Sequence, residues 1–243
     1  MNVYGKSDIG LIRKTNQDDI KFKKIDEKTF WIVICDGMGG AKGGDIAGSM
    51  AVSTISAIFN KYFFEKLEHR DEIKKMMVSA VVQSGDKIFD TASENADLSG
   101  MGTTVVAAIL QEDVLHIAHV GDSRAYIINN SGIHQLTKDH SIVQEMLTKG
   151  EITKEEAGSH PQRNIITRAL GIQKGILPDY GRFEMLSGDR ALFCTDGLTN
   201  ELSETEICDI FKSSNESGKI PDNLIKAANS RKGADNITVA VIV

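Results

Sequence analysis

The sequence contains few cysteines, and their spacing excludes the commonest cysteine-based sites. Three cysteines occur among 243 residues, and no pair has the CxxC spacing of a zinc or redox motif. Cys35 and Cys194 lie inside apolar runs, where cysteine acts as a small hydrophobic side chain. We therefore expect all three thiols, Cys208 included, to be reduced and structural.

Proline is equally scarce, and long apolar or low-complexity segments are absent. Only three prolines occur, and neither a linker nor a repeat at solenoid spacing divides the chain. The sequence has no run of ~18 apolar residues, and its N-terminal segment lacks the apolar core of a signal peptide. We therefore expect a single domain over residues 1–243, cytoplasmic and monomeric, with no membrane partner.

An excess of positive charge is also missing. The chain carries 28 Lys and Arg against 34 Asp and Glu, which gives a formal net charge of −6. Domains that bind nucleic acid usually present clustered basic residues, so this balance predicts no nucleic-acid partner.

Apolar periodicity predicts two long helices and a set of strands. Apolar residues recur at the helical period in residues 45–68 and again in 71–90. The runs that are typical of strands are 29–35, 103–110, 113–119, 124–128, 190–195 and 237–243. This order predicts an α+β fold in which helices cover antiparallel sheets.

A polar stretch interrupts the strand-like runs between residues 128 and 190. It contains a short helix that ends at Gly150 and a second one that begins at Thr153, where Glu156 completes a capping box. A segment of this length is typical of a flap beside a site, and we place the flap at roughly 139–180. The alternative is that this stretch is a solvent-facing segment without function.

Four aspartates at the ends of apolar runs form the main functional signal. Asp36, Asp122 and Asp196 closely follow such runs, and Asp235 precedes the last one. A sheet that places these strands side by side brings the carboxylates together, and hard cations such as Mg2+ and Mn2+ prefer oxygen ligands. One Asp-Gly step alone is more often a turn, but its repetition favours a metal-dependent hydrolase.

Two other motifs carry weaker signals. The glycine-rich segment 37–44 lacks the GK[ST] ending of a nucleotide-binding P-loop, but Gly37 is a candidate to offer its carbonyl oxygen to a metal ion. His116 and His119 are three residues apart on a predicted strand. Their side chains therefore point to opposite faces, which excludes a shared zinc ion.

Eight short motifs occur in a fixed order along the chain. They are RKTNQDD (13–19), DGMGGAKGGDIA (36–47), MGTT (101–104), VGDSRAY (120–126), LTKDHS (136–141), ITRALG (166–171), CTDGLTN (194–200) and ADNIT (234–238). This series resembles that of the metal-dependent serine/threonine protein phosphatases of type 2C, and of their bacterial members in particular. The resemblance covers residues 7–243, and the shared order argues against coincidence.

The resemblance implies a fold and a set of metal ligands. The fold is a sandwich of two antiparallel β-sheets flanked by α-helices, with the metal site at one end and a small helical flap. Two to three Mn2+ or Mg2+ ions would bind there. Asp36 would bridge two ions, the carbonyl oxygen of Gly37 would bind one of them, and Asp196 and Asp235 would complete the ligands of the other. Asp122, with Asp196, would hold a third and weaker ion.

The resemblance also implies catalytic roles and partners. Arg13 would bind the phosphate, for which a planar guanidinium is suited, and Asp18 would hold metal-bound waters. The reaction would be dephosphorylation of phosphoserine and phosphothreonine proteins by direct attack of a water that bridges two ions. The implied partners are phosphorylated proteins, including a cognate serine/threonine kinase.

The sequence differs from eukaryotic members of the family at Met38 and departs from the family pattern at two further positions. Met38 stands where eukaryotic members carry a histidine after Asp-Gly, so a metal-bound water would protonate the leaving group. Ala41 stands where bacterial members usually carry a histidine, and Gln17 replaces a glutamate that many members have. We expect slower turnover or altered metal dependence from these changes, and an active enzyme.

The sequence leaves two other functions open. One is a phosphoprotein-binding module without turnover, although such modules usually lose metal carboxylates and this chain keeps them. The other is a phosphatase devoted to one regulatory partner, such as an anti-sigma-factor antagonist. Phosphoproteomics after deletion of the gene would identify the physiological substrates.

Overall fold

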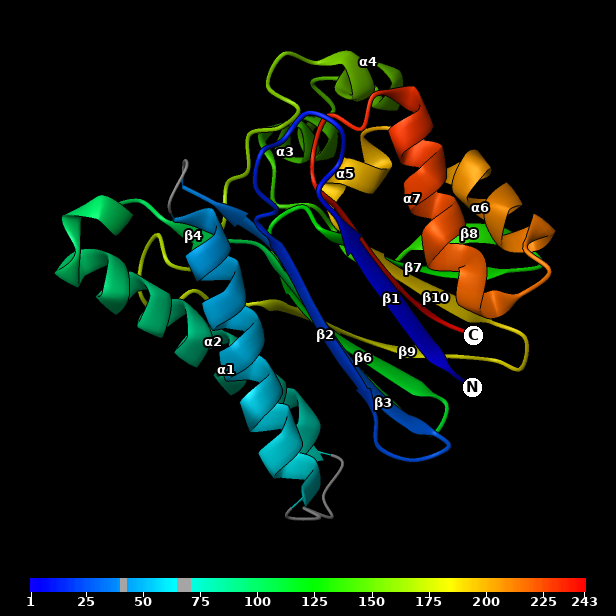
Figure 1. Ribbon diagram of the computed structural model, residues 1–243, viewed down its shortest axis with the longest axis horizontal. Helices are drawn as coiled ribbons and strands as arrows, with labels where there is room; N and C mark the ends of the chain where they lie inside the picture. Colours follow the sequence, from blue (N-terminus) through cyan, green and yellow to red (C-terminus); the bar gives the residue numbers. More distant parts are fainter. Residues whose placement is uncertain (40–42, 65–70) are drawn as a thin grey trace.

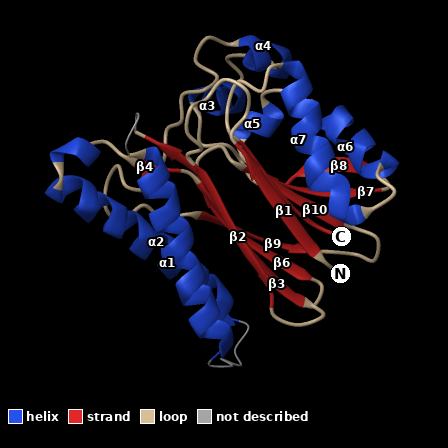
Figure 2. Cartoon of the chain, in the orientation of Figure 1, coloured by secondary structure: helices blue, strands red, loops and turns tan. Residues whose placement is uncertain are grey.

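Two antiparallel β-sheets face each other at the centre of the molecule, and a pair of helices covers the outer face of each sheet (Figure 1, Figure 2). This arrangement comes from a computed structural model that describes residues 1–39, 43–64 and 71–243. Ala41, which stands where bacterial members usually carry a histidine, lies outside the described residues.

Each sheet is antiparallel between all neighbouring strands. The order in one sheet is β1 (Val3–Asp8), β11 (Ile237–Ile242), β10 (Arg190–Cys194), β7 (Arg124–Asn129) and β8 (Gly132–Gln135). The order in the other is β2 (Asp18–Lys24), β3 (Thr29–Met38), β5 (Val105–Gln111), β6 (Val114–Val120) and β9 (Asp179–Glu184), and β4 (Gly102–Thr103) pairs with β3.

Strand β3 shows why the predicted strands read as continuous apolar runs. Successive side chains of a strand point to opposite faces, and here both faces are buried. Phe30, Ile32 and Ile34 belong to the apolar layer between the two sheets. Trp31 and Cys35 belong to the layer beneath the helices, where the Trp31 ring meets that of Phe59 edge-on, 6.1 Å between centroids.

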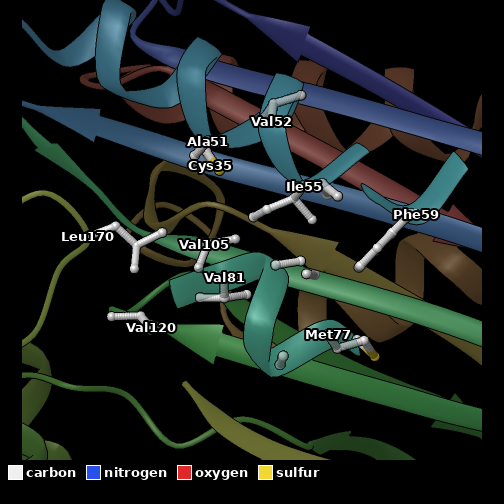
Figure 3. Close-up of a cluster of buried hydrophobic side chains, with 14 of the residues drawn as sticks. Cys35, Ala51, Val52, Ile55, Phe59, Met77, Val81, Val105, Val120 and Leu170 are labelled. Atoms are coloured by element: carbon white, nitrogen blue, oxygen red, sulfur yellow. The ribbon is translucent and has the colours of Figure 1, made fainter. Parts of the chain in front are cut away.

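The helices that cover the second sheet are α1 (Gly44–Phe64) and α2 (Asp71–Glu94), which confirm the two predicted long helices. The end of the first prediction, residues 65–68, lies outside the described residues. Side chains from both helices interleave with those of β3, β5 and β6, as Figure 3 shows for Ile55, Met77 and Val105. Among the described residues, no helix combines the length and the apolarity that crossing a membrane requires.

The helices that cover the first sheet are α6 (Glu204–Ser213) and α7 (Ile220–Arg231), which periodicity alone did not predict. Shorter elements are η2 (Ala96–Leu98), α5 (Asp196–Thr199) and η3 (Ser217–Lys219). Cys35, Cys194 and Cys208 are all free and buried, as predicted.

The segment between β8 and β9 contains α3 (Ile142–Lys149) and α4 (Lys154–Ser159). Gly150 ends α3 in the left-handed conformation, with φ 72°, and Thr153 and Glu156 form the predicted capping box of α4. β9 begins at Asp179, so the last two residues of the range 139–180 belong to the sheet. Figure 1 places α3, α4 and α5 together at one end of the sandwich.

Apart from the two-residue β4, the strands of the described residues that the apolar pattern missed are edge strands. β1 and β8 form the two edges of one sheet, and β2 and β9 form those of the other. An edge strand has one neighbour and tolerates polar side chains, so its apolar signal is weak. In β2, DDIKFKK, only Asp18 is fully buried.

Candidate active site

The predicted carboxylates meet at one end of the sandwich because the strands that carry them run antiparallel. Asp36 lies near the end of β3, and the register of β2 and β3 places Asp18 directly opposite it. Asp196 follows the end of β10, and Asp235 precedes the start of its antiparallel neighbour β11. Asp122 follows β6. The two sheets therefore contribute carboxylates to one place.

A cavity of about 550 Å3 lies at this place. Its walls include every predicted metal ligand together with the predicted phosphate-binding arginine. These lining residues are Asp36, Gly37, Asp122, Asp196, Asp235 and Arg13. Asp18 does not line the cavity but is buried behind it, where its Oδ2 accepts a hydrogen bond from Thr195 Oγ1 at 2.9 Å.

Burial and mutual repulsion raise the pKa values of four of these carboxyl groups. Burial, followed by the charges of Asp18 and Asp196, raises the pKa of Asp36 well above its usual value. Burial is also the main cause that raises the pKa of Asp18 and that of Asp122, each to about 7. The pKa of Asp196 is raised by burial and then by the charge of Asp235. A bound cation would offset this repulsion, so the donor set fits hard metal ions.

Gly37 stands where no other residue fits. A Cβ atom on Gly37 would lie 1.9 Å from the carbonyl oxygen of Gly44 and 2.7 Å from that of Gln17. Its N–H donates to that same Gln17 oxygen at 3.1 Å. The backbone next to Asp36 is therefore packed tightly between the N-terminal loop and the start of α1.

The MGTT motif fixes the backbone of Asp36 in place. The carbonyl oxygen of Asp36 accepts hydrogen bonds from Thr104 N and Thr103 Oγ1, both at 2.9 Å, and its N–H donates to Thr104 Oγ1 at 3.1 Å. Thr104 Oγ1 also lies 2.7 Å from Oγ of Ser123, the residue after Asp122. One buried network thus connects the segments that carry two of the predicted ligands.

Asn236 anchors the N-terminal loop, a role that the sequence did not predict. Its Nδ2 donates to the carbonyl oxygens of Ile9, at 2.9 Å, and Thr15, at 3.1 Å, and its Oδ1 accepts from Gln17 N at 2.9 Å. The loop that carries Arg13 is therefore tied to the residue next to Asp235. The only sequence signal for this role is the position of Asn236 inside the ADNIT motif.

Arg13 forms a contact that was also not predicted. Its Nη2 donates to Asp235 Oδ2 at 2.7 Å, and about half of its side chain is exposed. Asp196 has a separate partner, since Asn200 Nδ2 donates to its Oδ2 at 2.9 Å. Arg13, the candidate for binding the phosphate, therefore lies at the edge of the carboxylate cluster.

A second cavity of about 380 Å3 adjoins the first and shares Asp122 and Asp196 with it. Residues of α3, α4 and α5 line this second cavity, so the flap lies beside the carboxylate cluster. A partly buried ion pair between Arg124 and Asp139, with Nη2 and Oδ2 2.6 Å apart, is part of its lining.

Comparison with known proteins identifies the family. The profile of the protein phosphatase 2C family matches residues 13–223. This chain belongs to the protein phosphatase 2C family. The serine/threonine phosphatase stp of Listeria welshimeri is 39% identical over 242 residues, which cover 100% of this chain and 95% of the relative.

Solved structures of protein phosphatase 2C members confirm the predicted fold. The serine/threonine phosphatase of S. agalactiae superposes with a TM-score of 0.92 at 36% identity, covering 99% of this chain and 98% of that one. The catalytic domain of the phosphatase PstP, solved in complex with two manganese ions, gives a TM-score of 0.85 at 30% identity, with 99% and 96% covered.

Proposed function

We propose that this protein is a metal-dependent phosphatase that removes phosphate from phosphoserine and phosphothreonine residues of proteins. The observation that carries the proposal is the group of carboxylates gathered around one cavity with an arginine at its edge, among which burial and then the charges of its neighbours raise the pKa of Asp36. Membership of the protein phosphatase 2C family supports it.

The residues that would hold the ions are those predicted from the sequence. Asp36 would lie between two ions, Gly37 would offer its carbonyl oxygen to one, and Asp196 and Asp235 would bind the other. Asp122, which adjoins the second cavity, would share a third ion with Asp196. Two to three Mn2+ or Mg2+ ions fit this donor set, because these cations prefer carboxylate and carbonyl oxygens. When bound, such ions make a water molecule more acidic and offset the charge of a phosphoryl group.

The protein's own side chains then position the phosphate. Arg13 is half exposed at the edge of the cavity, and its guanidinium can donate two parallel hydrogen bonds to phosphate oxygens. We assign it to the phosphate and not to the metals. A water oxygen would form a bond to phosphorus and the water would give up a proton, while the bond from phosphorus to the serine or threonine oxygen would break and that oxygen would take up a proton, which leaves inorganic phosphate and the free hydroxyl group.

Asp18 supports the site from behind. Its carboxylate is buried, accepts from Thr195 Oγ1, and lies opposite Asp36 in the register of β2 and β3. We assign it the role of holding waters that complete the ligands of the ions. It would act through those waters and would not touch the substrate.

Four further expectations remain predictions. They are a cognate serine/threonine kinase as partner, a cytoplasmic location, a monomeric state and the organisation of residues 1–243 as one domain. The relatives named as phosphatases support phosphoprotein substrates in general.

The deciding experiment is hydrolysis of p-nitrophenyl phosphate and of a phosphothreonine peptide by the purified protein, with Mn2+, with Mg2+ and with excess EDTA. We expect turnover with either ion and none with EDTA. A protein that binds the phosphopeptide without hydrolysing it would be a binding module instead, and full activity in EDTA would exclude metal catalysis.

A further inference from the structure

A buried histidine joins the flap to the loop that carries Asp122. His140 lies between β8 and α3 and is 8% exposed. Its backbone N–H donates to the carbonyl oxygen of Gly121 at 3.0 Å, and the N–H of Gly121 donates to His140 Nδ1 at 3.0 Å. One residue therefore holds both polar groups of the glycine that directly precedes Asp122.

The other edge of the same ring faces the flap. His140 Nε2 lies 2.8 Å from Arg168 Nη1 and 3.3 Å from Asp179 Oδ2. Arg168 also donates to Asp179 Oδ1 at 2.7 Å and to the carbonyl oxygen of Leu177. Arg168 belongs to the ITRALG motif and Asp179 opens β9, so this edge of the ring connects the end of the flap to the sheet.

A count of donors and acceptors shows a conflict at this ring. Burial, followed by the charges of Arg168 and His119, lowers the pKa of His140, which favours the neutral ring at pH 7. A neutral imidazole has one N–H and one lone pair, whereas the backbone N–H of Gly121 and the guanidinium of Arg168 can only donate. The ring can therefore accept a hydrogen bond from Gly121 or from Arg168, but not from both at once.

The same residues do not form a metal site, although ligand atoms of His119, His140 and Asp179 lie within 4.8 Å of one another. A histidine that binds a metal donates its second N–H to an acceptor. His119 Nε2 has such an acceptor in the carbonyl oxygen of Lys138 at 2.9 Å. His140 lacks such an acceptor, because its Nδ1 faces the N–H of Gly121 and its Nε2 lies beside the cationic Arg168.

We propose that His140 is a positioning residue that couples the flap to the metal site, because its ring holds either Gly121 or Arg168. In one tautomer Nδ1 accepts from Gly121, which fixes the loop of Asp122, and Nε2–H donates to Asp179. In the other, Nε2 accepts from Arg168 and Gly121 loses its acceptor. Release of Arg168 thus strengthens the hold on the Asp122 loop. The inference rests on the proposed function, in which Asp122 is a metal ligand.

The test is amide hydrogen exchange of Gly121 in metal-free protein, which requires neither activity nor substrate. In His140→Asn, the amide oxygen can replace Nδ1 as the acceptor for Gly121. In His140→Gln, the longer amide reaches the position of Nε2 and leaves Gly121 without an acceptor. We expect Gly121 to exchange roughly tenfold faster in His140→Gln than in His140→Asn. In Arg168→Ala it should exchange more slowly than in wild type.

His134→Gln is the matched control, because His134 lies on β8, where its Nε2 is 2.8 Å from Ser131 Oγ, and it takes no part in the contacts of His140 and Gly121 described above. It should leave the exchange of Gly121 unchanged. Calorimetric Mn2+ titration should show the weakest site about tenfold weaker in His140→Gln and near normal in His140→Asn.

Equally fast exchange of Gly121 in His140→Asn and in His140→Gln would show that His140 only fills space. Faster exchange in Arg168→Ala than in the wild type would show that Arg168 supports Gly121 instead of competing with it. Either result overturns the proposal. If His140→Gln does not fold, the Arg168→Ala result decides, because the predicted slowing is opposite to the effect of general loosening. The proposed function has a separate test in the metal-dependent turnover of the wild type.

Discussion

Arg13 and Asp235 form an ion pair in which Arg13 Nη2 lies 2.7 Å from Asp235 Oδ2. The residues are 222 positions apart in sequence, and they meet because Asn236 ties the N-terminal loop to the start of β11. In our assignment one partner binds the phosphate and the other binds a metal ion. The pair therefore places phosphate recognition directly beside the metal ligands.

Replacing Arg13 with alanine should lower kcat/KM by roughly one to two powers of ten. A charge-assisted hydrogen bond contributes ~1.5–3 kcal/mol, and this contact would be lost in the transition state. Mn2+ affinity should stay equal or rise slightly, since Asp235 no longer has a cationic partner. Arg13→Lys should recover part of the loss, because an ammonium keeps the charge but not the two-pronged contact.

A suitable control for Arg13 is Arg231→Ala, which removes another exposed arginine from an ion pair, that with Glu206. It should leave kcat/KM and phosphate inhibition unchanged. If Arg13→Ala weakens Mn2+ binding as strongly as phosphate binding, Arg13 is structural. Arg163 of the flap, which lines the adjoining cavity, would then be the next candidate for the phosphate.

Asp36→Asn and Asp235→Asn should each lose about 3 kcal/mol or more of transition-state stabilisation, a fall of at least ~100-fold in kcat/KM. Each substitution keeps the size of the side chain and removes one anionic ligand. Steady-state kinetics on p-nitrophenyl phosphate at saturating Mn2+ measure the effect. The exposed Asp222→Asn, which only loses its pair with Lys6, is the control and should be unaffected. Near-normal turnover in either test variant would contradict the ligand assignment.

Asp122→Ala should behave differently from these two variants. The ion that Asp122 shares with Asp196 is inferred to be weak, so its loss should reduce turnover and leave the other two ions in place. Crystals of the variant grown with Mn2+ should show two ions. A variant that binds no ion at all would place Asp122 in the principal site.

How much of the fold could be predicted depended on how deeply each element is buried. β3 and β11 are buried on both faces, and their apolar runs predicted them. The edge strands β1, β2, β8 and β9 have polar, partly exposed side chains, and no apolar pattern marks them. Helices α6 and α7 present narrow apolar stripes within short segments, so apolar periodicity predicted neither of them.

The site likewise contains features that the sequence predicted and features that it did not. The carboxylates could be found because each stands at the end of an apolar run, and the motif series assigned roles to them. Their supporting contacts depend on atoms from segments far apart in sequence, such as Thr104 with Asp36 and Asn236 with Thr15. No local pattern encodes such contacts, which is why the anchoring role of Asn236 and the pairing of Arg13 with Asp235 appear only in three dimensions.

The last prediction concerns pH and the stability of the metal-free protein. The pKa of Asp18 is raised to about 7, mainly by burial, whereas in the unfolded chain a carboxyl group ionises near its usual value of 3.8. Between these values the folded state binds a proton that the unfolded state has released. The contribution of Asp18 to stability therefore falls as pH rises through this window, by about 1.4 kcal/mol for each pKa unit at most.

The Asp18→Asn variant has no carboxyl group to titrate at this position. Comparing it with the wild type therefore isolates the contribution of Asp18 from those of other groups. The comparison is needed because His116, whose pKa is lowered to about 4 by burial, contributes with the opposite sign below pH 6.5. Urea unfolding in EDTA at pH 5 and pH 8 should show that the variant gains stability relative to wild type as pH rises, by an amount on the order of 1–3 kcal/mol. Saturating Mn2+ should reduce this gain, because bound cations favour the ionised carboxylates. A stability difference that does not change with pH would mean that Asp18 is ionised in the folded protein without metal, and that burial and its neighbours do not raise its pKa.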